Sequence, residues 1–246
     1  MKAMIFAAGL GTRLRPLTDN MPKALVPVAG KPMLERVIIR LKEAGFDDIT
    51  VNIHHFGEQI IDFLRANNNF GVNIHISDER GELLDTGGGI QKARPFLEGN
   101  ESFLVHNADI LTDIDLAAFY RHHQESNAEV TLLVSERKTS RYLLFDNSYN
   151  LCGWINKSTG EVKPEGFSYR EGNHKELAFG GIHVISPSLF RYMENGQWTG
   201  KFSIIPFYLS VCRQTYIQGY PLQGFQWFDI GKPETLAEAE KLFCQL

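Results

Sequence analysis

The amino-acid sequence predicts an α/β protein with a mainly parallel mixed sheet, and three observations support this fold class. Short apolar segments alternate with amphipathic segments through about the first 135 residues, as in repeated β–α–β units. A glycine-rich loop directly follows the first apolar segment. The 246 residues are 43% apolar and 22% charged, which is the composition of an ordinary globular protein.

The first half of the chain is expected to supply most of the sheet. Apolar and alternating segments predict strands at 2–7, 48–53, 72–76, 102–105 and 130–134. Segments with one apolar face predict helices from Pro32 to just before Gly45, and at 57–66, 86–96 and 115–125. Helices should therefore cover both faces of a parallel sheet, with a ligand crevice beyond the carboxyl ends of the strands. The pair His122-His123 is expected to face solvent on the last of these helices.

The second half follows a different pattern, in which strands are less regular. Strands are expected at 142–145, 151–155, 178–185, 216–220 and 227–229, and helices at 202–213 and 233–243. The polar stretch at 156–175 is expected to be a long loop. No repeat or linker divides the chain, so we expect a single domain over residues 1–246 with halves at about 1–135 and 136–246.

Charge and cysteine content exclude several classes of protein. The 25 Lys and Arg residues against 29 Asp and Glu give a net charge of −4, which offers no general attraction for nucleic acid. The cysteines Cys152, Cys212 and Cys244 have neither disulfide-framework nor zinc-site spacing, which suits a reducing compartment. No apolar segment approaches the ~18 residues of a membrane span, and the apolar N-terminal segment is too short for a secretion signal. We expect a cytoplasmic protein without membrane attachment.

The loop after the first strand has the composition of a phosphate-binding loop. Its glycines let the backbone turn tightly and bring N–H groups close to phosphate oxygens. No Gly-x4-Gly-Lys-Ser/Thr string occurs, which excludes a P-loop, and a dinucleotide loop would need glycine where Leu14 stands. Two alternatives remain open: a plain tight turn, or a loop that brings its own cations Arg13, Arg15 and Lys23 to the phosphates.

Three strings in one register, AGLGTRLRPLT at 8–18, PKALVPV at 22–28 and GKPM at 30–33, closely resemble the signature of sugar 1-phosphate nucleotidyltransferases. Further blocks at 85–90, 107–109 and 227–236 extend the resemblance over nearly the whole chain. The resemblance implies a Rossmann-like, three-layer α/β/α nucleotidyltransferase fold. It also implies an enzyme that joins a nucleoside triphosphate to a sugar 1-phosphate, releasing pyrophosphate, with a nucleotide-binding first half and a sugar-binding second half.

The resemblance also assigns roles to individual residues. Arg13 is expected to contact the departing pyrophosphate and Lys23 the α-phosphate region, where cations stabilise developing charge. Asp109 and Asp229 are expected to hold Mg²⁺, although each alone is also typical of a turn or a helix cap. Asn107 and Gly181 are expected at the sugar. The expected nucleotide-binding residues are Ala8, Gly9, Gly11, Thr12, Arg13, Lys23, Thr86, Gly87 and Gly88.

The sugar-binding half departs from the commonest family pattern. Many relatives carry a Glu-Lys-Pro string whose lysine binds the sugar phosphate, whereas this chain has Asn156-Lys157-Ser158. Tyr142 is followed by leucine where many relatives have glycine, and Ala108 precedes Asp109 where glycine is common. The sugar pocket is therefore not expected to be the commonest one.

Strings at 52–60, 85–90 and 107–113 favour UTP as nucleotide and N-acetylmuramate 1-phosphate as acceptor, in cell-wall recycling. The uracil is expected against the Gly87–Gly88 backbone, and Arg141, Lys157 or Lys175 could receive the lactyl carboxylate of the sugar. One alternative is a guanylyltransferase that acts on mannose or heptose 1-phosphate, with Glu82 or Asp85 as partner of the guanine amine. A second alternative, from another class, is a nucleotide sensor without catalysis, which would not need two metal-binding carboxylates.

Overall fold

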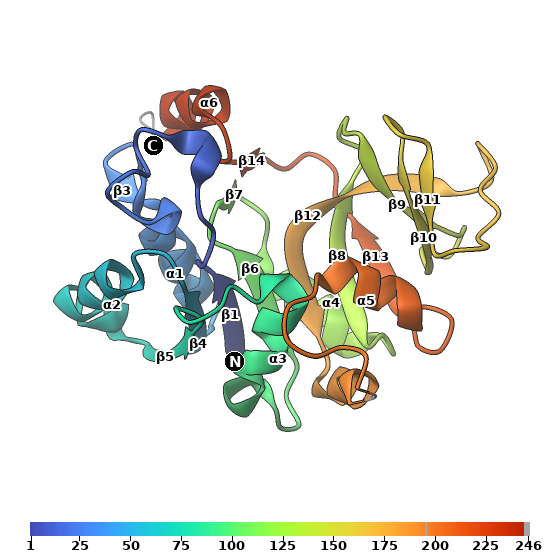
Figure 1. Cartoon of the computed structure of the whole chain (residues 1–246), viewed down its shortest axis with the longest axis horizontal. Coiled ribbons are helices and arrows are strands. Elements are labelled where there is room, and N and C mark those ends of the chain that lie inside the picture. The colour runs from blue at the N-terminus through green and yellow to red at the C-terminus, as the bar shows by residue number, and fades with distance from the viewer. Residues whose placement is uncertain (195, 244–246) are drawn as a thin grey trace.

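The computed structural model describes residues 1–194 and 196–243 and contains one large sheet, to which ten strands of this part of the chain belong (Figure 1). Its main arm has the order β5-β4-β1-β6-β12-β8-β13, and all neighbours are parallel except β12, which runs antiparallel to β6 and β8. The predicted mainly parallel mixed sheet is thereby confirmed. The strand bounds are β1 Lys2–Phe6, β4 Asp48–Ile53, β5 Asn73–Asp78, β6 Phe103–Asn107, β8 Val130–Ser135, β12 Lys175–Ile185 and β13 Ile217–Pro221.

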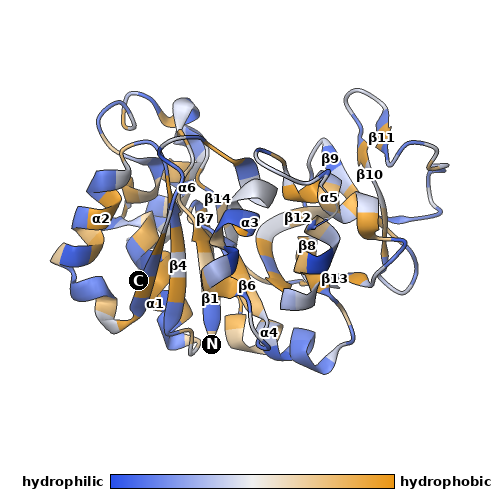
Figure 2. Ribbon diagram, turned by 60° about the horizontal axis from the view of Figure 1, so that its bottom comes forward, coloured by the Kyte–Doolittle hydropathy of each residue, from blue (hydrophilic) through white to orange (hydrophobic). Residues whose placement is uncertain are grey.

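Helices cover both faces of this sheet, because alternate side chains of a strand point to opposite sides. In β1, Ala3 and Ile5 pack into one hydrophobic cluster, whereas Met4 packs into the other. Helices α1, α2, α4 and α6 contribute to the first cluster, and α3 and α5 to the second. Figure 2 shows the central strands mostly in the hydrophobic colour. The helix bounds are α1 Met33–Glu43, α2 Gly57–Ala66, α3 Asp85–Leu97, α4 Leu116–Glu125, α5 Ile204–Val211 and α6 Pro233–Phe243.

Helix α1 shows how the sequence sets an element. Met33, Leu34, Val37, Ile38 and Leu41 are all buried, at the three- and four-residue spacing that places side chains on one helix face. The helix begins directly after a proline and ends before a glycine in a left-handed conformation, as the sequence predicts. None of the described helices is both long enough and apolar enough to cross a membrane.

A smaller arm of the sheet branches from β12, whose first residues pair with β9 (Arg141–Phe145). It continues through β10 (Leu151–Asn156) to β11 (Glu161–Lys163). The expectation of an unbroken loop over 156–175 is therefore wrong, because a tight turn at Asn156–Gly160 returns the chain alongside β10. Gly160 permits this turn with a φ of 74°.

The prediction that both residues of His122-His123 face solvent is wrong for His123. Helix α4 packs this side chain onto the sheet, where its Nδ1 lies 2.8 Å from Thr131 Oγ1. Its Nε2 lies 3.2 Å from Ser102 Oγ and 3.1 Å from Ser186 Oγ. Hydroxyl groups on three neighbouring segments thus hold a histidine that the local pattern places outside.

Two small two-stranded sheets lie apart from the large sheet. β7 (Ile110–Thr112), which the sequence pattern did not predict, pairs antiparallel with β14 (Trp227–Asp229). Their register sets Asp229 opposite Ile110, the residue after Asp109. β2 (Pro27–Val28) and β3 (Lys31–Pro32) form the second pair. The β7–β14 pairing brings together two acidic residues that are 120 positions apart in the chain.

Candidate active site

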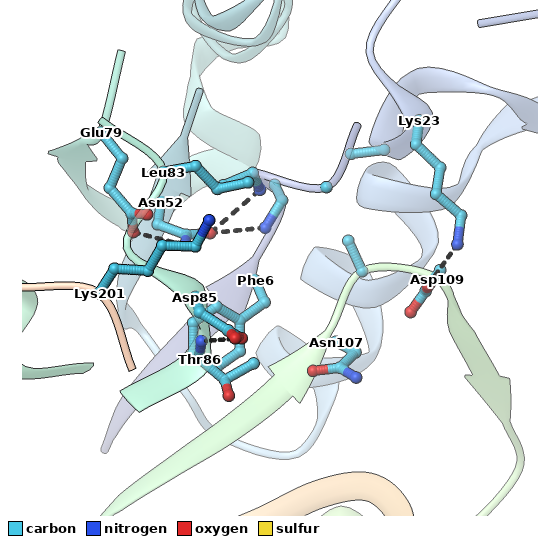
Figure 3. A pocket seen from close by; sticks show the side chains of 15 residues that line it. Phe6, Lys23, Asn52, Glu79, Leu83, Asp85, Thr86, Asn107, Asp109 and Lys201 are labelled. Carbon is cyan, nitrogen blue, oxygen red and sulfur yellow. Dashed lines mark hydrogen bonds and ion pairs between the residues drawn. The ribbon is translucent and has the colours of Figure 1, made fainter. Parts of the chain in front are cut away.

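A cavity of about 380 Å³ opens where β1, β4 and β6 end, as expected for a parallel sheet (Figure 3). The loop after β1 forms one wall, and the start of α3 forms another. The end of β6 and the segment that follows it complete the floor. The residues around it are Phe6, Ala7, Ala8, Gly9, Lys23, Ala24, Asn52, Glu79, Leu83, Asp85, Thr86, Asn107, Ala108, Asp109 and Lys201.

The glycine-rich loop is held in shape by close contacts. Gly11 has a φ of 66°, and a Cβ atom there would lie 2.8 Å from Thr18 Cγ2 and 3.0 Å from Lys23 Cβ. The Thr18 hydroxyl donates to the Gly11 carbonyl oxygen over 2.8 Å. Glycine is therefore required at this position by conformation and by space.

Asn52 and Glu79 support the same loop, and both were missed in the sequence. Asn52 Oδ1 accepts hydrogen bonds from the N–H groups of Ala7 (2.7 Å) and Ala8 (3.2 Å). Its Nδ2 donates to Oε1 of Glu79 over 2.7 Å, and Glu79 Oε2 accepts from Leu84 N over 3.0 Å. This buried network fixes the start of the loop relative to the start of α3 (Figure 3).

Lys23 and Asp109 form an ion pair in the cavity (Figure 3). The side chain of Lys23 is only 11% exposed and that of Asp109 26% exposed. The 3-10 helix Lys23–Leu25 delivers the lysine, and the turn between β6 and β7 delivers the aspartate. The lysine expected at the α-phosphate therefore contacts an aspartate expected at the metal ion.

Asp229 lies beside this pair. Its Oδ1 is buried and has no hydrogen-bond partner among the described residues. Burial, together with the nearby Asp109 carboxylate, raises its pKa, while Lys23, Arg13 and Arg137 oppose the increase. Two carboxylates therefore converge here with incomplete compensation by cations.

The carboxylates at this site suit a divalent cation that is also bound by oxygens of a phosphate chain. In the parts of the chain that the structure describes, no group of three or more His, Cys, Asp or Glu side chains could hold a metal ion. Asp109 and Asp229 supply two hard carboxylate ligands, and a buried carboxylate oxygen of Asp229 is free to bind. Mg²⁺ is typically held by one or two carboxylates plus phosphate oxygens and water. The residues fit that group.

Arg13 extends the site toward a small neighbouring hollow of about 370 Å³, which Gly9, Gly11, Thr12 and Lys23 also line. A Cβ atom on Gly231 would lie 2.7 Å from Arg13 Nη2 and 2.8 Å from Asp229 Oδ1. The guanidinium and the carboxylate therefore both approach the backbone at Gly231. The glycine-rich loop, Arg13 and Lys23 border this space together with Asp109. A glycine-rich loop with two cations suits a polyphosphate.

The start of α3 differs from the expected base platform. Thr86 lines the cavity, but its Oγ1 accepts from Ile204 N over 2.9 Å. The N–H groups of Gly87 and Gly88 donate to the Phe202 carbonyl oxygen, and a Cβ atom on Gly88 would lie 2.1 Å from the Gly200 oxygen. The close approach of the segment at 200–202 explains both glycines, and a contact of either with the base stays a prediction.

Asn107 and Gly181 lie side by side. A Cβ atom on Gly181, whose φ is 74°, would lie 3.0 Å from Asn107 Nδ2. Asn107 lines the cavity described above. A second cavity of about 520 Å³ is lined by residues of β9, β10, β11, β12 and α5, together with Arg137 and Ser203. Arg141, Trp154, Lys163 and Phe179 are among these residues. Ser203 Oγ lies 3.5 Å from Thr86 Oγ1, so the two cavities adjoin.

Lys157 and Lys175 do not line this second cavity. Lys157 Nζ donates to Tyr169 Oη and to Glu176 Oε1, both over 2.7 Å. Lys175 Nζ lies 3.6 Å from the centre of the Tyr149 ring. Of the three cations expected near the sugar, only Arg141 lies in the cavity.

The fold and the paired carboxylates beside a phosphate-binding loop define a nucleotide-dependent group-transfer protein. The nucleotidyl transferase family model matches residues 2–245, and the chain belongs to this family. It is 37% identical to N-acetylmuramate alpha-1-phosphate uridylyltransferase of Neisseria meningitidis, over 98% of both chains. It is 31% identical to mannose-1-phosphate guanyltransferase of Schizosaccharomyces pombe, over 95% of this chain and 62% of the relative.

The fold is also found in solved structures. One, from Bacillus anthracis, is assigned as a glucose-1-phosphate thymidylyltransferase in complex with sucrose. It superimposes with a TM-score of 0.82 at 19% identity, covering 100% of this chain and 96% of the other. The sequence-based assignment to the sugar-phosphate nucleotidyltransferases, and to their Rossmann-like fold, is thereby confirmed.

Proposed function

We propose that this protein joins UTP to N-acetylmuramate 1-phosphate with the help of Mg²⁺, giving a nucleotide sugar and pyrophosphate. The observation that carries the proposal is the convergence of Arg13, Lys23, Asp109 and Asp229 at one end of the cavity beside the glycine-rich loop. The similarity to the uridylyltransferase of Neisseria meningitidis over nearly the whole of both chains supports the choice of substrates.

The chain's own groups suit this chemistry. An oxygen of the acceptor phosphate attacks the α-phosphorus of UTP, while the bond from that phosphorus to the bridging oxygen of pyrophosphate breaks. Lys23 and Arg13 oppose the negative charge that grows on the phosphates as this happens. Asp109 and Asp229 would hold Mg²⁺, which supplies Lewis-acid neutralisation of phosphate oxygens when bound. The remaining contribution is positioning, by the loop that Asn52 and Glu79 support.

The second cavity supports an acceptor that carries its own carboxylate. Arg141 lines this cavity, and its guanidinium forms no ion pair or side-chain hydrogen bond within the described chain. The aromatic side chains of Trp154 and Phe179 line the same cavity and supply apolar surface for a sugar ring. We assign Arg141 to the lactyl carboxylate, because Lys157 and Lys175 are engaged elsewhere.

A guanylyltransferase that acts on mannose or heptose 1-phosphate is the second candidate, and the position of Asp85 favours it. The Asp85 carboxylate lines the first cavity, where it could accept from the guanine amine, although it already accepts from Thr86 N over 2.6 Å. Glu82, the other carboxylate considered, does not line this cavity. A sensor without catalysis is disfavoured, because it would have no use for two carboxylates aligned by the β7–β14 pairing.

A competition assay tests the choice of base and sugar. Purified protein receives equal concentrations of UTP and GTP with Mg²⁺ and one acceptor at a time: N-acetylmuramate, mannose or heptose 1-phosphate. We expect the UDP-sugar of N-acetylmuramate to dominate the product. Predominance of a GDP-sugar would replace this proposal by the second candidate, and the absence of pyrophosphate with every pair would support the sensor.

The proposal includes a cytoplasmic location, where nucleoside triphosphates are available. The free thiols of Cys152 and Cys212 are compatible with a reducing compartment. Cys244 lies outside the described residues.

A further inference from the structure

Arg137 occupies the junction between the paired carboxylates and the second cavity. It follows β8 by two residues and lines the second cavity together with Arg141. Its guanidinium carbon lies 4.1 Å from the centre of the Trp227 ring, in the strand that ends at Asp229. No role at the nucleotide or the metal was expected for this residue, because nothing in its local sequence distinguishes it from a surface arginine.

The guanidinium is held in one place by its surroundings. Nη2 donates to the carbonyl oxygen of Phe179 over 2.9 Å, and the Trp227 ring covers one face. Burial lowers the pKa of Arg137, while the charge of Asp229 acts against that shift. An arginine fixed by stacking and one hydrogen bond is preorganised for a planar grip on an anion, because little rotamer freedom remains to be lost.

One donor of this side chain has no partner. Arg137 Nε is buried and makes no hydrogen bond with any described residue. Leaving a buried donor of a charged group unpaired is unfavourable, and a ligand oxygen bound at this donor would remove that cost. Arg137 lines the second cavity and interacts electrostatically with Asp229, one of the paired carboxylates. The unpaired donor therefore lies near the junction of the two cavities.

Lys157, at the position where many relatives carry the lysine for the sugar phosphate, is not available for that purpose. Its ammonium group is hydrogen-bonded to Glu176 and Tyr169, outside the cavity wall. These two partners raise the pKa of Lys157, and Glu176 cancels its charge locally. Because Lys157 is paired outside the cavity, we infer that the cation for the acceptor phosphate comes from another position in this chain.

We propose that Arg137 binds the phosphate of the acceptor sugar 1-phosphate. This inference rests on the proposed transfer reaction but not on the identity of the base or the sugar. The guanidinium holds the acceptor phosphate next to Asp109 and Asp229, and so sets the attacking oxygen beside the metal-binding carboxylates. Arg141 lines the same cavity. With N-acetylmuramate 1-phosphate as acceptor, it would bind the lactyl carboxylate, and the two arginines would fix the direction of the sugar.

A different role for Arg137 would be that of a counter-ion for Asp229 alone. The two roles predict different kinetic changes. Loss of a counter-ion changes metal binding, and therefore the Mg²⁺ concentration for half-maximal rate. Loss of the acceptor grip raises the KM for the sugar 1-phosphate and leaves the KM for the nucleotide and the metal requirement unchanged.

The test compares Arg137→Gln and Arg137→Lys with wild-type protein, and uses Lys157→Met as the matched control. Steady-state rates of pyrophosphate release are measured against the acceptor, the nucleotide and Mg²⁺ in turn, using whichever acceptor the wild-type protein turns over. We expect the KM for the acceptor to rise by about 30-fold or more in Arg137→Gln, as for loss of a hydrogen-bonded charged group. Arg137→Lys should recover part of this loss, and Lys157→Met should stay within about twofold of wild type.

The outcomes separate this inference from the proposed reaction. Active wild-type protein with an unchanged acceptor KM in Arg137→Gln overturns the role of Arg137 only. A change confined to the Mg²⁺ requirement assigns Arg137 to Asp229 and also overturns the inference. A raised acceptor KM in Lys157→Met would assign the binding of the acceptor phosphate to Lys157 and overturn the inference.

Wild-type protein that releases no pyrophosphate with any nucleotide and acceptor overturns the proposed function and this inference together. If Arg137→Gln fails to fold by circular dichroism, Arg137→Lys alone decides, with an expected acceptor KM about tenfold above wild type.

Discussion

The ammonium group of Lys23 is hydrogen-bonded to the carboxylate of Asp109, across 86 positions of sequence. This contact joins the residue expected at the α-phosphate to a residue expected at the metal. A phosphate chain that arrives with a divalent cation can replace it, giving each side chain a partner of opposite charge. Before substrate binds, the pair therefore leaves neither Lys23 nor Asp109 without a partner of opposite charge.

Asp109→Asn tests the role of this carboxylate. We expect turnover to fall by far more than tenfold at limiting Mg²⁺, since one metal ligand loses its charge and tenfold corresponds to only ~1.4 kcal/mol of barrier. The fold should persist, because Asp109 lies in a turn and its side chain is 26% exposed. Pyrophosphate release and circular dichroism provide the two readouts. Retention of more than about a tenth of the wild-type rate would remove Asp109 from the metal site.

Lys23→Ala and Arg13→Ala should lower turnover more than they weaken nucleotide binding. Their charges oppose negative charge that grows in the transition state, so their effect is larger there than on bound substrate. The check is the comparison of kcat with separately measured dissociation constants for the nucleotide. Arg15→Ala is a suitable control, since Arg15 is exposed and paired with Asp19. A defect in binding alone, with kcat unchanged at saturation, would assign both residues to ground-state binding.

Asn52→Ala should disorder the glycine-rich loop without removing any charge from the site. Asn52 satisfies two backbone N–H groups of the loop and the buried Glu79 carboxylate. We expect a stability loss of about 2–4 kcal/mol, because these buried polar groups lose their partner, together with a raised KM for the nucleotide. Urea unfolding and steady-state kinetics measure the two effects. Asn73→Ala, an exposed asparagine on β5, is the control; an equal loss in both variants would contradict a special role for Asn52.

The fold was largely predictable from sequence, and so was the group of charged residues that the structure brings together at the candidate site, because these signals are local. The loop string, the apolar strands and the positions of Asp109 and Asp229 each lie within a few neighbouring residues. The Asn52–Glu79 network was not predictable in this way, because Asn52 lies in β4 and Glu79 directly follows β5, and the two meet only when these strands pair.

Distant contacts also explain why the sequence pattern assigned Gly87 and Gly88 to the base, whereas the structure packs both against residues 200–202. Their requirement for glycine comes from the segment at 200–202, which is more than 100 positions away in the chain. Tertiary contacts also explain why His123 is buried and does not face solvent, because hydroxyl groups of other segments form its polar environment. Residues whose role depends on distant partners have no signature in a local pattern.

Acid should destabilise the fold well above the pH at which carboxylates become protonated. Burial lowers the pKa of His106 and His123 to about 4 and that of His183 to about 3. In the unfolded chain these rings take up protons near pH 6.5. Below that pH the unfolded state binds more protons than the native state, so the free energy of unfolding falls as pH decreases from 6.5 towards 4. Each histidine contributes at most about 1.4 kcal/mol per pH unit.

His183→Phe isolates one of these contributions. Both ring nitrogens of His183 are buried without a described partner, and the ring stacks with Phe179 at a centroid distance of 5.4 Å. Phenylalanine keeps the stacking and cannot be protonated, so the decline of unfolding free energy between pH 6.5 and 4 should be shallower by up to about 1.4 kcal/mol per pH unit. Urea titrations at four pH values measure this slope, and His55→Gln, at an exposed position, serves as the control. Parallel pH profiles for His183→Phe and wild type would contradict a neutral, buried His183 as a source of acid sensitivity.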